Sequence, residues 1–345
     1  MSVTLRDVAR LANVSVKTVS RVVNHQGEIS AATRQRVQVA IEQLGYHPNI
    51  LARSLVSRRS NTLAVVAFGL DYYGPSHTIT GIEQKAEELG YSLLLSLASR
   101  PDDPDVDSLL APLVARQVDG IIWAIPEIGD NRAWIRCERL EQLPPVVFIN
   151  MAPRPGLAVV AIDNRLGAAL ATQHLIDLGR KQIGLITGPL DWWEARERRA
   201  GWQETVARAG LPISPALVAE GDWSAASGER GLRALLAGQP DLDAVFVSND
   251  QMALGVLGAA QQLGRRIPQD LAVAGFDNIP ESGFMCPPLT TIFQPLVEAG
   301  GVAVQELQKI IRAQQDEAGI EFTATWLAPE LVVRASSTAA RPAPA

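Results

Sequence analysis

The sequence predicts an α/β protein in which a small helical N-terminal domain precedes a larger body of alternating strands and helices. The first 48 residues contain three segments whose apolar residues recur at helical spacing. Beyond residue 61 the pattern changes to apolar runs of strand length separated by helical stretches. With 345 residues the chain is too long for one ordinary core, so more than one domain is expected.

Composition excludes several classes of protein. Hydrophobic residues make up 47% and charged residues 20% of the chain, as in soluble globular proteins. No run of about 18 apolar residues occurs, and no basic segment followed by an apolar one opens the chain. We therefore expect no membrane contact, no secretion signal and a cytoplasmic location. The two cysteines, Cys137 and Cys286, show no metal-ligand spacing and are predicted to be buried free thiols, and neither a metal nor a cofactor is expected.

Charge is distributed unevenly along the chain. The formal net charge is −6, yet residues 1–60 carry nine Lys or Arg against three acidic residues, which leaves −12 for the remainder. An excess of cations confined to a small domain is the electrostatic footprint expected for contact with phosphates.

The first two helices are predicted from their caps. Thr4 precedes the apolar residues of 5–12 as an N-cap, and Asn13 suits a left-handed turn. Ser15 then offers a second N-cap before the apolar residues of 16–23. Two short helices joined by a tight turn form a helix-turn-helix, whose second helix enters the major groove of DNA. A plain amphipathic helical hairpin is the alternative interpretation.

The second helix carries the side chains that suit base readout. Lys17 could donate to guanine acceptors, and Val16 could touch a thymine methyl group. The hydroxyl groups of Ser15, Thr18 and Ser20 could hold phosphates. The predicted DNA contacts of this helical region are Thr4, Leu5, Ser15, Val16, Lys17, Thr18, Ser20, Arg21 and Asn24.

A third helix and an apolar linker complete the N-terminal region. Ser30 caps the helix predicted over 31–44, and Gly45 ends it. The segment YHPNILARSLVSRRSNT, residues 46–62, follows and contains Leu51, Leu55 and Val56, which a purely solvated linker would not need. We therefore expect a helical domain over 1–48 and a short apolar-basic helix with its linker over 49–61.

The remainder of the chain is predicted to be a doubly wound α/β body. Helical stretches such as 81–90 and 169–179 alternate with buried strands, which favours a parallel sheet covered on both faces and, over this length, two such halves. The runs of strand length are TLAVVAF (62–68), YSLLLSL (91–97), DGIIWAI (119–125), PPVVFIN (144–150), QIGLITG (182–188), AVFVSND (244–250) and DLAVAGFD (270–277).

With these segments in place, the chain resembles the LacI/GalR family of bacterial transcriptional regulators from Thr4 to about Ala335. The resemblance implies a hinge helix that folds on operator DNA, with Leu55 wedged into the minor groove and Asn49, Ala52 and Arg53 beside it. It also implies a body of the periplasmic-binding-protein-like (type I) kind over 62–335, with a ligand cleft between two subdomains. Their expected bounds are about 62–161 with 292–323, and about 162–291 with 324–335, followed by a disordered tail over 336–345.

Polar residues that follow the predicted strands point to the ligand. Ligands of open α/β sheets bind at the carboxyl ends of the strands, where this chain has DYYGPSH, Asn150, DWWEARERR, Asn249 with Asp250, and Asp277 with Asn278. A turn or capping role is the alternative for each one alone. Together, carboxylates, amides, a guanidinium and an indole are groups that bind sugar hydroxyls and cover a sugar ring.

The resemblance assigns roles to individual residues of this cleft. It implies that Arg198 grips sugar hydroxyls and that the ring rests on Trp223, for which a packed core indole is the alternative. Asn150 stands where an aspartate is found in the sugar-regulated relative, Glu194 stands where a small hydroxyl residue is found, and Trp192 and Trp193 add bulk. The predicted effector-binding residues are Pro75, Ser76, Asn150, Asp163, Trp192, Glu194, Arg198, Trp223, Asn249, Asp277 and Gln294.

The predicted function is therefore a transcriptional repressor whose affinity for operator DNA is controlled by a small, galactoside-like sugar. A palindromic operator requires a two-fold protein, so a homodimer is expected. The resemblance implies that it forms through the helices of 71–110, and the tail lacks leucine heptads for a tetramer. A nucleobase-responsive co-repressor-type regulator, with Trp223 as a stacking wall, is the alternative. No glycine-rich GxGxxG motif follows the first strand and no nucleophile–histidine motif is recognisable, so an enzyme is not expected.

Overall fold

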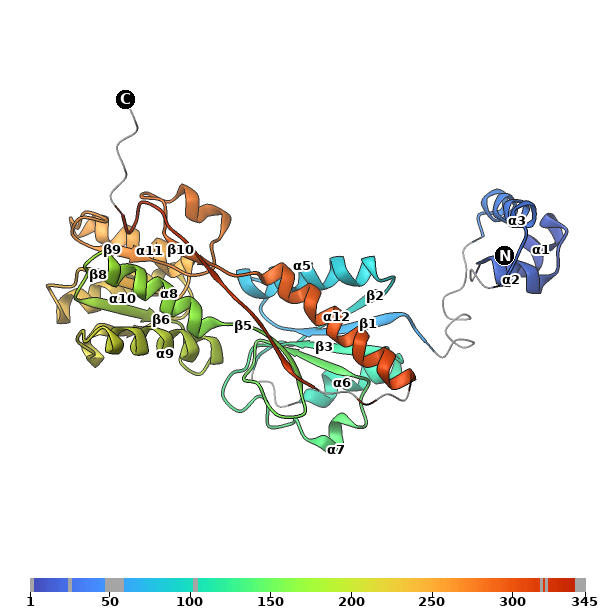
Figure 1. Cartoon of the computed structure of the whole chain (residues 1–345), viewed down its shortest axis with the longest axis horizontal. Coiled ribbons are helices and arrows are strands. Elements are labelled where there is room, and N and C mark those ends of the chain that lie inside the picture. Colours follow the sequence, from blue (N-terminus) through green and yellow to red (C-terminus); the bar gives the residue numbers. More distant parts are fainter. Residues whose placement is uncertain are drawn as a thin grey trace, which may run out of the picture. The chain divides into compact units, whose positions relative to one another are not determined.

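The computed structural model describes residues 3–23, 27–46, 59–101, 105–316, 319 and 322–338. The chain forms two compact units, Met1–Asn61 and Thr62–Ala345, each considered by itself below (Figure 1).

The first unit contains the three predicted helices, α1 (Leu5–Ala12), α2 (Val16–Val23) and α3 (Ala31–Leu44). The Asp7 carboxylate accepts hydrogen bonds from the backbone N and the Oγ1 of Thr4, at 3.0 and 2.6 Å. Asn13 is left-handed with φ 51°, and Ser15 Oγ accepts from Thr18 N at 3.0 Å. The helix-turn-helix prediction is confirmed down to these local signals.

A small apolar core holds these helices together. Val8 of α1, Val19 of α2 and Val37 of α3 are fully buried in it, and Tyr46 closes it after α3. Since the buried positions of α2 take up one side of that helix, the opposite side remains exposed to solvent.

The second unit begins with a six-stranded parallel sheet in the order β11-β5-β4-β3-β1-β2. Alternate residues of β1 point to opposite faces, because side chains in a strand alternate. One face packs against α5 (Tyr73–Glu88) and α12 (Leu296–Gln315), and the other against α6 (Val106–Ala115). The strands are β1 (Thr62–Ala67), β2 (Ser92–Leu97), β3 (Gly120–Ala124), β4 (Val146–Ile149), β5 (Ala158–Ile162) and β11 (Ala324–Leu327), and α7 (Cys137–Leu140) lies between β3 and β4 in the chain.

A second parallel sheet, in the order β7-β6-β8-β9, forms the other half of this unit. Its core is lined by α8, which packs against α9, and by α10, which packs against α11. The elements are α8 (Asn164–Asp177), β6 (Ile183–Thr187), α9 (Trp193–Arg208), η1 (Pro215–Leu217), β7 (Val218–Glu220), α10 (Ala225–Gly238), β8 (Ala244–Val247), α11 (Asp250–Gln262), β9 (Ala272–Ala274) and η2 (Pro280–Phe284).

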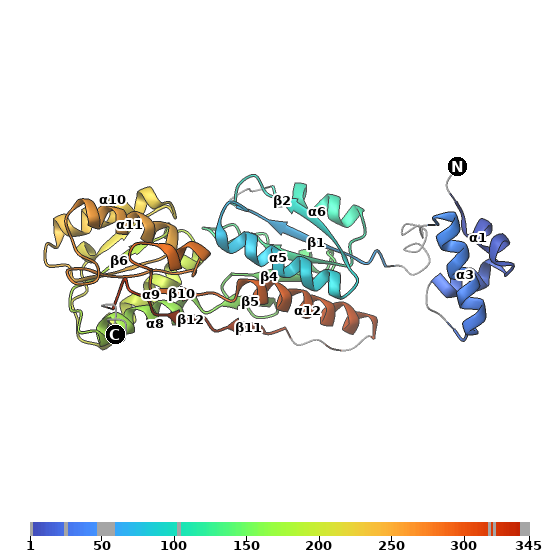
Figure 2. The ribbon, with the colours of Figure 1, turned by 90° about the horizontal axis from the view of Figure 1, so that it is seen from above.

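The chain passes between the two halves three times (Figure 2). It crosses after β5, between β10 (Thr291–Phe293) and α12, and between β11 and β12 (Glu330–Val332), and β10 pairs with β12 in an antiparallel ladder. β11 pairs in parallel with β5 of the first sheet, so the predicted assignment of 324–327 to the second subdomain is wrong. That crossing follows Leu327 rather than residue 323.

Two further predictions are corrected. Ser336 and Ser337 are buried, and Ser336 Oγ donates to Val273 O and accepts from Thr290 N, both at 2.7 Å, so the predicted tail does not begin at residue 336. Cys137 and Cys286 are exposed rather than buried, because Cys137 opens the short surface helix α7 and Cys286 precedes Pro287 in a loop.

Each of the seven predicted strand runs contains a strand, but the sequence analysis did not select five others in the described residues, namely β5, β7, β10, β11 and β12. No group of three or more His, Cys, Asp or Glu that could hold a metal ion occurs within those residues. None of their helices is both long enough and apolar enough to cross a membrane.

The contact between α5 and α12 depends on glycine. A Cβ atom at Gly81 would lie 1.9 Å from Val297 O, and one at Gly300 would lie 2.1 Å from Thr78 O, so the two helix backbones approach closely where they run side by side (Figure 2). We expect Gly81→Ala to lower the free energy of unfolding by about 2 kcal/mol or more, because the backbone must shift.

Scanning calorimetry of the body checks this prediction against a matched variant. Gly258 lies in α11 with open space around its Cα, so Gly258→Ala should raise stability by about 0.5–1 kcal/mol through helix propensity alone. A Gly81→Ala protein that melts at or above the temperature of Gly258→Ala would contradict the close-packing argument.

Candidate functional site

The exposed side of α2 is the first candidate site. Val16 is 42% exposed, and Lys17 and Arg21 also face solvent. Ser15 and Thr18 form the N-cap, with their hydroxyl oxygens 2.9 Å apart. Val16, Lys17 and Arg21, three of the predicted DNA contacts, are thus all accessible on this short helix, as base readout requires.

The remaining predicted DNA residues divide into two groups. Thr4 caps α1, Leu5 packs against the core of the first unit, and Ser20 is half-buried, so each has a structural role as well. Asn24, Asn49, Ala52, Arg53 and Leu55 lie outside the described residues.

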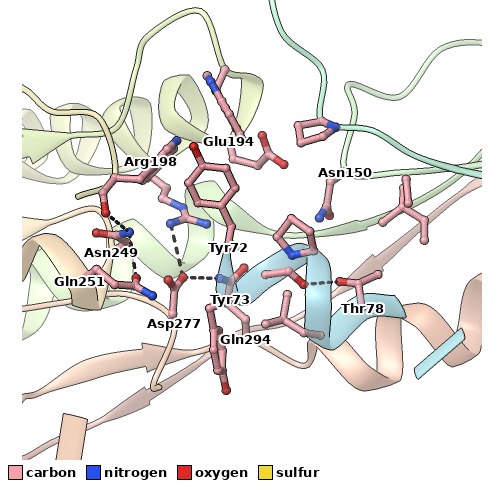
Figure 3. A pocket seen from close by; sticks show the side chains of 18 residues that line it. Tyr72, Tyr73, Thr78, Asn150, Glu194, Arg198, Asn249, Gln251, Asp277 and Gln294 are labelled. Atoms are coloured by element: carbon pink, nitrogen blue, oxygen red, sulfur yellow. Dashed lines mark hydrogen bonds and ion pairs between the residues drawn. The ribbon is translucent and has the colours of Figure 1, made fainter. Parts of the chain in front are cut away.

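The second candidate site is a cavity between the two sheets of the body that is partly open to solvent. Its walls follow the carboxyl ends of β1, β3, β4, β6, β8, β9 and β10, which is where α/β proteins bind ligands (Figure 3). It is lined by Tyr72, Tyr73, Gly74, Pro75, Thr78, Ala124, Pro126, Ile149, Asn150, Trp192, Glu194, Arg198, Trp223, Asn249, Gln251, Asp277, Gln294 and Leu296.

Two of the predicted effector residues do not line this cavity. Ser76 lies in α5 and its Oγ donates to Tyr72 O and Tyr73 O, at 2.9 and 3.1 Å. Asp163 is the N-cap of α8 and accepts from Leu166 N at 2.8 Å. Both predictions are corrected, because these side chains satisfy their own helix termini. The structure brings the other nine together, namely Pro75, Asn150, Trp192, Glu194, Arg198, Trp223, Asn249, Asp277 and Gln294.

Sequence reasoning missed several lining residues. Tyr72 and Tyr73 stand within the DYYGPSH stretch that was singled out after the first strand, and Gln251 follows Asn249 and Asp250. These three had a signal, since they occur where a strand ends. Apolar members such as Ile149 and Leu296 had none, because they resemble core residues of their elements.

Arg198 is the centre of the polar wall. It is 6% exposed, its Nε donates to Asn164 Oδ1 at 2.8 Å, and its Nη1 donates to Ser248 O and lies 3.7 Å from Asp277 Oδ1. The guanidinium also stacks 3.8 Å from the centroid of the Phe276 ring. Burial lowers the pKa of Arg198, while Asp277 and Glu194 raise it. Its plane and position are therefore defined before any ligand binds.

Asp277 extends this wall toward Gln294. Its Oδ1 accepts from Gln294 Nε2 at 2.6 Å, and its φ of 118° places the carboxylate by a backbone conformation that L residues rarely adopt. Burial raises the pKa of Asp277, whereas Arg198 and the hydrogen bond from Gln294 lower it. Asp250 lies behind it, and burial together with the Asp277 charge raises the pKa of Asp250.

Trp223 and Asn249 form the neighbouring wall. Asn249 caps α11 by accepting from Met252 N at 2.8 Å, and its Nδ2 donates to Trp223 O at 3.1 Å and to Gln251 Oε1 at 3.0 Å. Trp223 has φ 70° and packs over Gly188, where a Cβ atom would lie 2.1 Å from the indole. A glycine at position 188 is therefore what allows this indole to occupy the wall.

A short backbone ladder joins the two halves beside the cavity. Ile128 and Trp192 form an antiparallel bridge, with Gly129 N donating to Asp191 O at 3.0 Å and Trp193 N donating to Glu127 O at 2.9 Å. The Trp193 side chain is buried in the core of the first half, so it does not line the cavity. This ladder, defined by residues 127–129 and 191–193, positions Trp192 and Glu194.

Several buried polar atoms of the cavity wall lack partners within the described part of the chain. They are Asn150 Oδ1, Glu194 Oε2 and Trp223 Nε1. Buried polar groups are normally hydrogen-bonded, so these atoms indicate a ligand that carries both donors and acceptors.

Comparison with known proteins identifies related families for both parts of the chain. The model of bacterial regulatory proteins of the lacI family matches residues 4–49, and that of the periplasmic binding protein-like domain matches residues 172–337. The ribose operon repressor of Escherichia coli K12 is 38% identical over 307 residues, covering 88% of this chain and 92% of that repressor. The lactose operon repressor of Escherichia coli K12 is 35% identical over 312 residues, covering 90% and 86%.

The whole architecture also matches a solved structure. The crystal structure of the lac repressor dimer bound to operator and the anti-inducer ONPF has a TM-score of 0.85 at 32% identity, covering 98% of this chain and 100% of that one. The family and fold predicted from the sequence are thereby confirmed, and these relatives are repressors rather than enzymes. The chain therefore belongs to the lacI family of bacterial regulatory proteins, DNA-binding transcriptional repressors with a periplasmic-binding-protein-like domain.

Proposed function

We propose that this repressor binds a small sugar in the cavity and that the sugar controls its affinity for operator DNA. The observation that carries the proposal is the buried set of Arg198, Asp277 and Gln294 beside the Trp223 indole. Sugar hydroxyls both donate and accept, so a guanidinium, a carboxylate and an amide can each bind them, and an indole can cover the apolar face of the ring.

The aromatic geometry favours a sugar over a nucleobase. The rings of Trp192 and Trp223 lie 5.7 Å apart at 72°, and those of Tyr72 and Trp192 lie 5.8 Å apart at 78°. A planar base is held best between roughly parallel faces, and neither pair provides them. Two of the relatives are also named for sugars, ribose and lactose.

The first unit binds operator DNA, and we propose that a homodimer binds a palindromic operator. Val16, Lys17 and Arg21 supply the exposed face of α2 for the major groove, and the basic charge of the first unit supplies phosphate contacts. A two-fold operator needs two such helices, and the lac repressor to which the chain is similar is a dimer on its operator.

Coupling between the sites follows from linkage. If the sugar binds better to the arrangement of the body that disfavours the operator complex, it weakens DNA binding by the same coupling energy. A coupling of about 1–3 kcal/mol changes operator affinity roughly 5- to 150-fold, which is enough for a switch.

Fluorescence anisotropy tests the proposal directly. The purified protein is first checked by light scattering for a mass of twice the 37.1 kDa chain, then titrated onto a labelled fragment of its own upstream region with galactosides, glucosides and purines. We expect one sugar to release the DNA. If only a purine releases the DNA or tightens its binding, the nucleobase alternative is favoured. A mass of four chains would contradict the dimer.

A further inference from the structure

The part of the cavity formed by the start of α9 has features that the wall around Arg198 does not account for. Glu194 lies one helical turn before Arg198, so roughly 5–6 Å separates their Cβ atoms on the same side of α9. Arg198 is turned toward Asp277 in the second half, whereas Glu194 follows the backbone ladder that joins α9 to the first half. The cavity therefore contains two polar regions rather than one (Figure 3).

The Glu194 carboxylate is only partly satisfied by the described residues around it. Glu194 is 9% exposed, and its Oε2 has no hydrogen-bond partner among the described residues, as is true of Asn150 Oδ1 on the same cavity. Burial raises the pKa of Glu194 to about 7, while a hydrogen bond from its own backbone, Arg198 and Arg132 lower it and Glu127 raises it further. Two buried acceptor atoms without donors favour a ligand that brings hydroxyl hydrogens to this region.

Aromatic rings extend over the same region. Trp223 is the first of a series in which Trp192 and then Tyr72 follow edge to face, so the aromatic surface continues beyond the ring that borders Arg198. Trp192 is held by the bridge to Ile128 and by the hydrogen bond from its N to Pro189 O at 3.0 Å. A second aromatic platform beside a second set of polar atoms is what a second sugar ring needs.

We propose that Glu194 and Trp192 form a second sugar subsite, so that the effector is a disaccharide whose first ring contacts Arg198 and Trp223 from the open side of the cavity. Glu194 accepts hydrogen bonds from hydroxyls of the second ring, Asn150 accepts from the same end of the ligand, and Trp192 covers the apolar face of that ring. This assignment rests on the proposed function, since it subdivides the same cavity. It makes Glu194 the residue that distinguishes a disaccharide from its single-ring counterpart.

The test compares sugars that share their first ring. The full-length protein is titrated in a calorimeter with methyl β-galactoside against lactose and with methyl β-glucoside against cellobiose. We expect one disaccharide to bind at least about 10-fold more tightly than its methyl glycoside at about pH 8, where Glu194 is largely ionised and hydrogen bonds to a buried charged group contribute at this scale. Glu194→Gln should reduce that ratio to within about 3-fold.

Two further variants make the result specific. Glu197→Gln removes a carboxylate from the same helix, but that carboxylate pairs with Arg165 outside the cavity, so the disaccharide preference should be unchanged. Trp192→Leu keeps the backbone ladder and removes the ring, so it should lose the preference as Glu194→Gln does. It also keeps the test decisive if Glu194→Gln does not fold.

The outcomes separate the two proposals. If single-ring and two-ring sugars bind equally, or if the preference persists in both Glu194→Gln and Trp192→Leu, the second subsite is wrong while the sugar-controlled repressor remains. If no sugar binds the parent protein, the proposed function fails and the subsite fails with it.

Discussion

Replacing Arg198 with lysine is expected to lower the affinity for the effector by at least about 30-fold and to leave a repressor that stays on its operator. The guanidinium reaches Asn164, Ser248 and Asp277 at once from a buried position, and it borders the cavity at the same time. Lysine keeps the charge but has a single nitrogen, so it cannot reproduce this planar set of contacts. A loss of about 2 kcal/mol corresponds to the 30-fold change.

The measurement is effector-induced release of labelled operator, with a matched substitution beside it. Arg199 follows on α9 but is exposed and does not line the cavity, so Arg199→Lys should respond to effector like the parent protein. Calorimetric melting shows whether the Arg198→Lys protein remains folded. If that protein is folded and is released at the parent effector concentration, Arg198 does not hold the ligand.

The helical unit could be predicted almost completely because its signals are local. Thr4, Ser15 and Ser30 each form a hydrogen bond with the residue three positions further on, and Asn13 ends α1 through its own left-handed backbone conformation. None of these contacts needs a partner from elsewhere in the chain, so the spacing of residue types was sufficient.

The body was predictable only where elements are long and apolar. β11 consists of four residues, ATWL, and becomes a strand because Val159 to Ile162 of β5 offer an open edge more than 160 residues earlier in the chain. A pattern of four residues does not indicate that a distant strand will pair with them. The same holds for the three-residue strands β10 and β12, which pair with each other across about 40 residues of chain.

Within the cavity, the limits of sequence reasoning are geometric. The stretch around Pro75 was treated as a unit, but α5 begins at Tyr73 and each further residue turns by about 100°. Pro75 and Thr78 therefore line the cavity, while Ser76 turns away and bonds to its own helix. Trp192 and Trp193 are adjacent in the chain but lie in the cavity and in the core of the first half, because the ladder at Ile128 holds the backbone between them.

Replacing both Lys17 and Arg21 with alanine is expected to weaken operator binding by about 30-fold or more while leaving the effector affinity unchanged. Each side chain is exposed on α2, and a base contact of this kind contributes about 1–3 kcal/mol of discrimination. The helix should remain folded, because the buried side of α2 consists of Val19 and Val22. The effector affinity should not change, since the cavity is lined by the second unit alone.

Salt dependence distinguishes readout of bases from a general loss of positive charge. Arg36→Ala removes a cation from α3, where the exposed side chain donates to Thr33 Oγ1 at 3.4 Å, and should weaken binding to operator and to unrelated DNA by the same small factor. The double substitution on α2 should instead reduce the preference for operator over unrelated DNA. An unchanged preference would mean that α2 supplies charge but does not read sequence, and the reader of the operator would then have to lie elsewhere in the first unit.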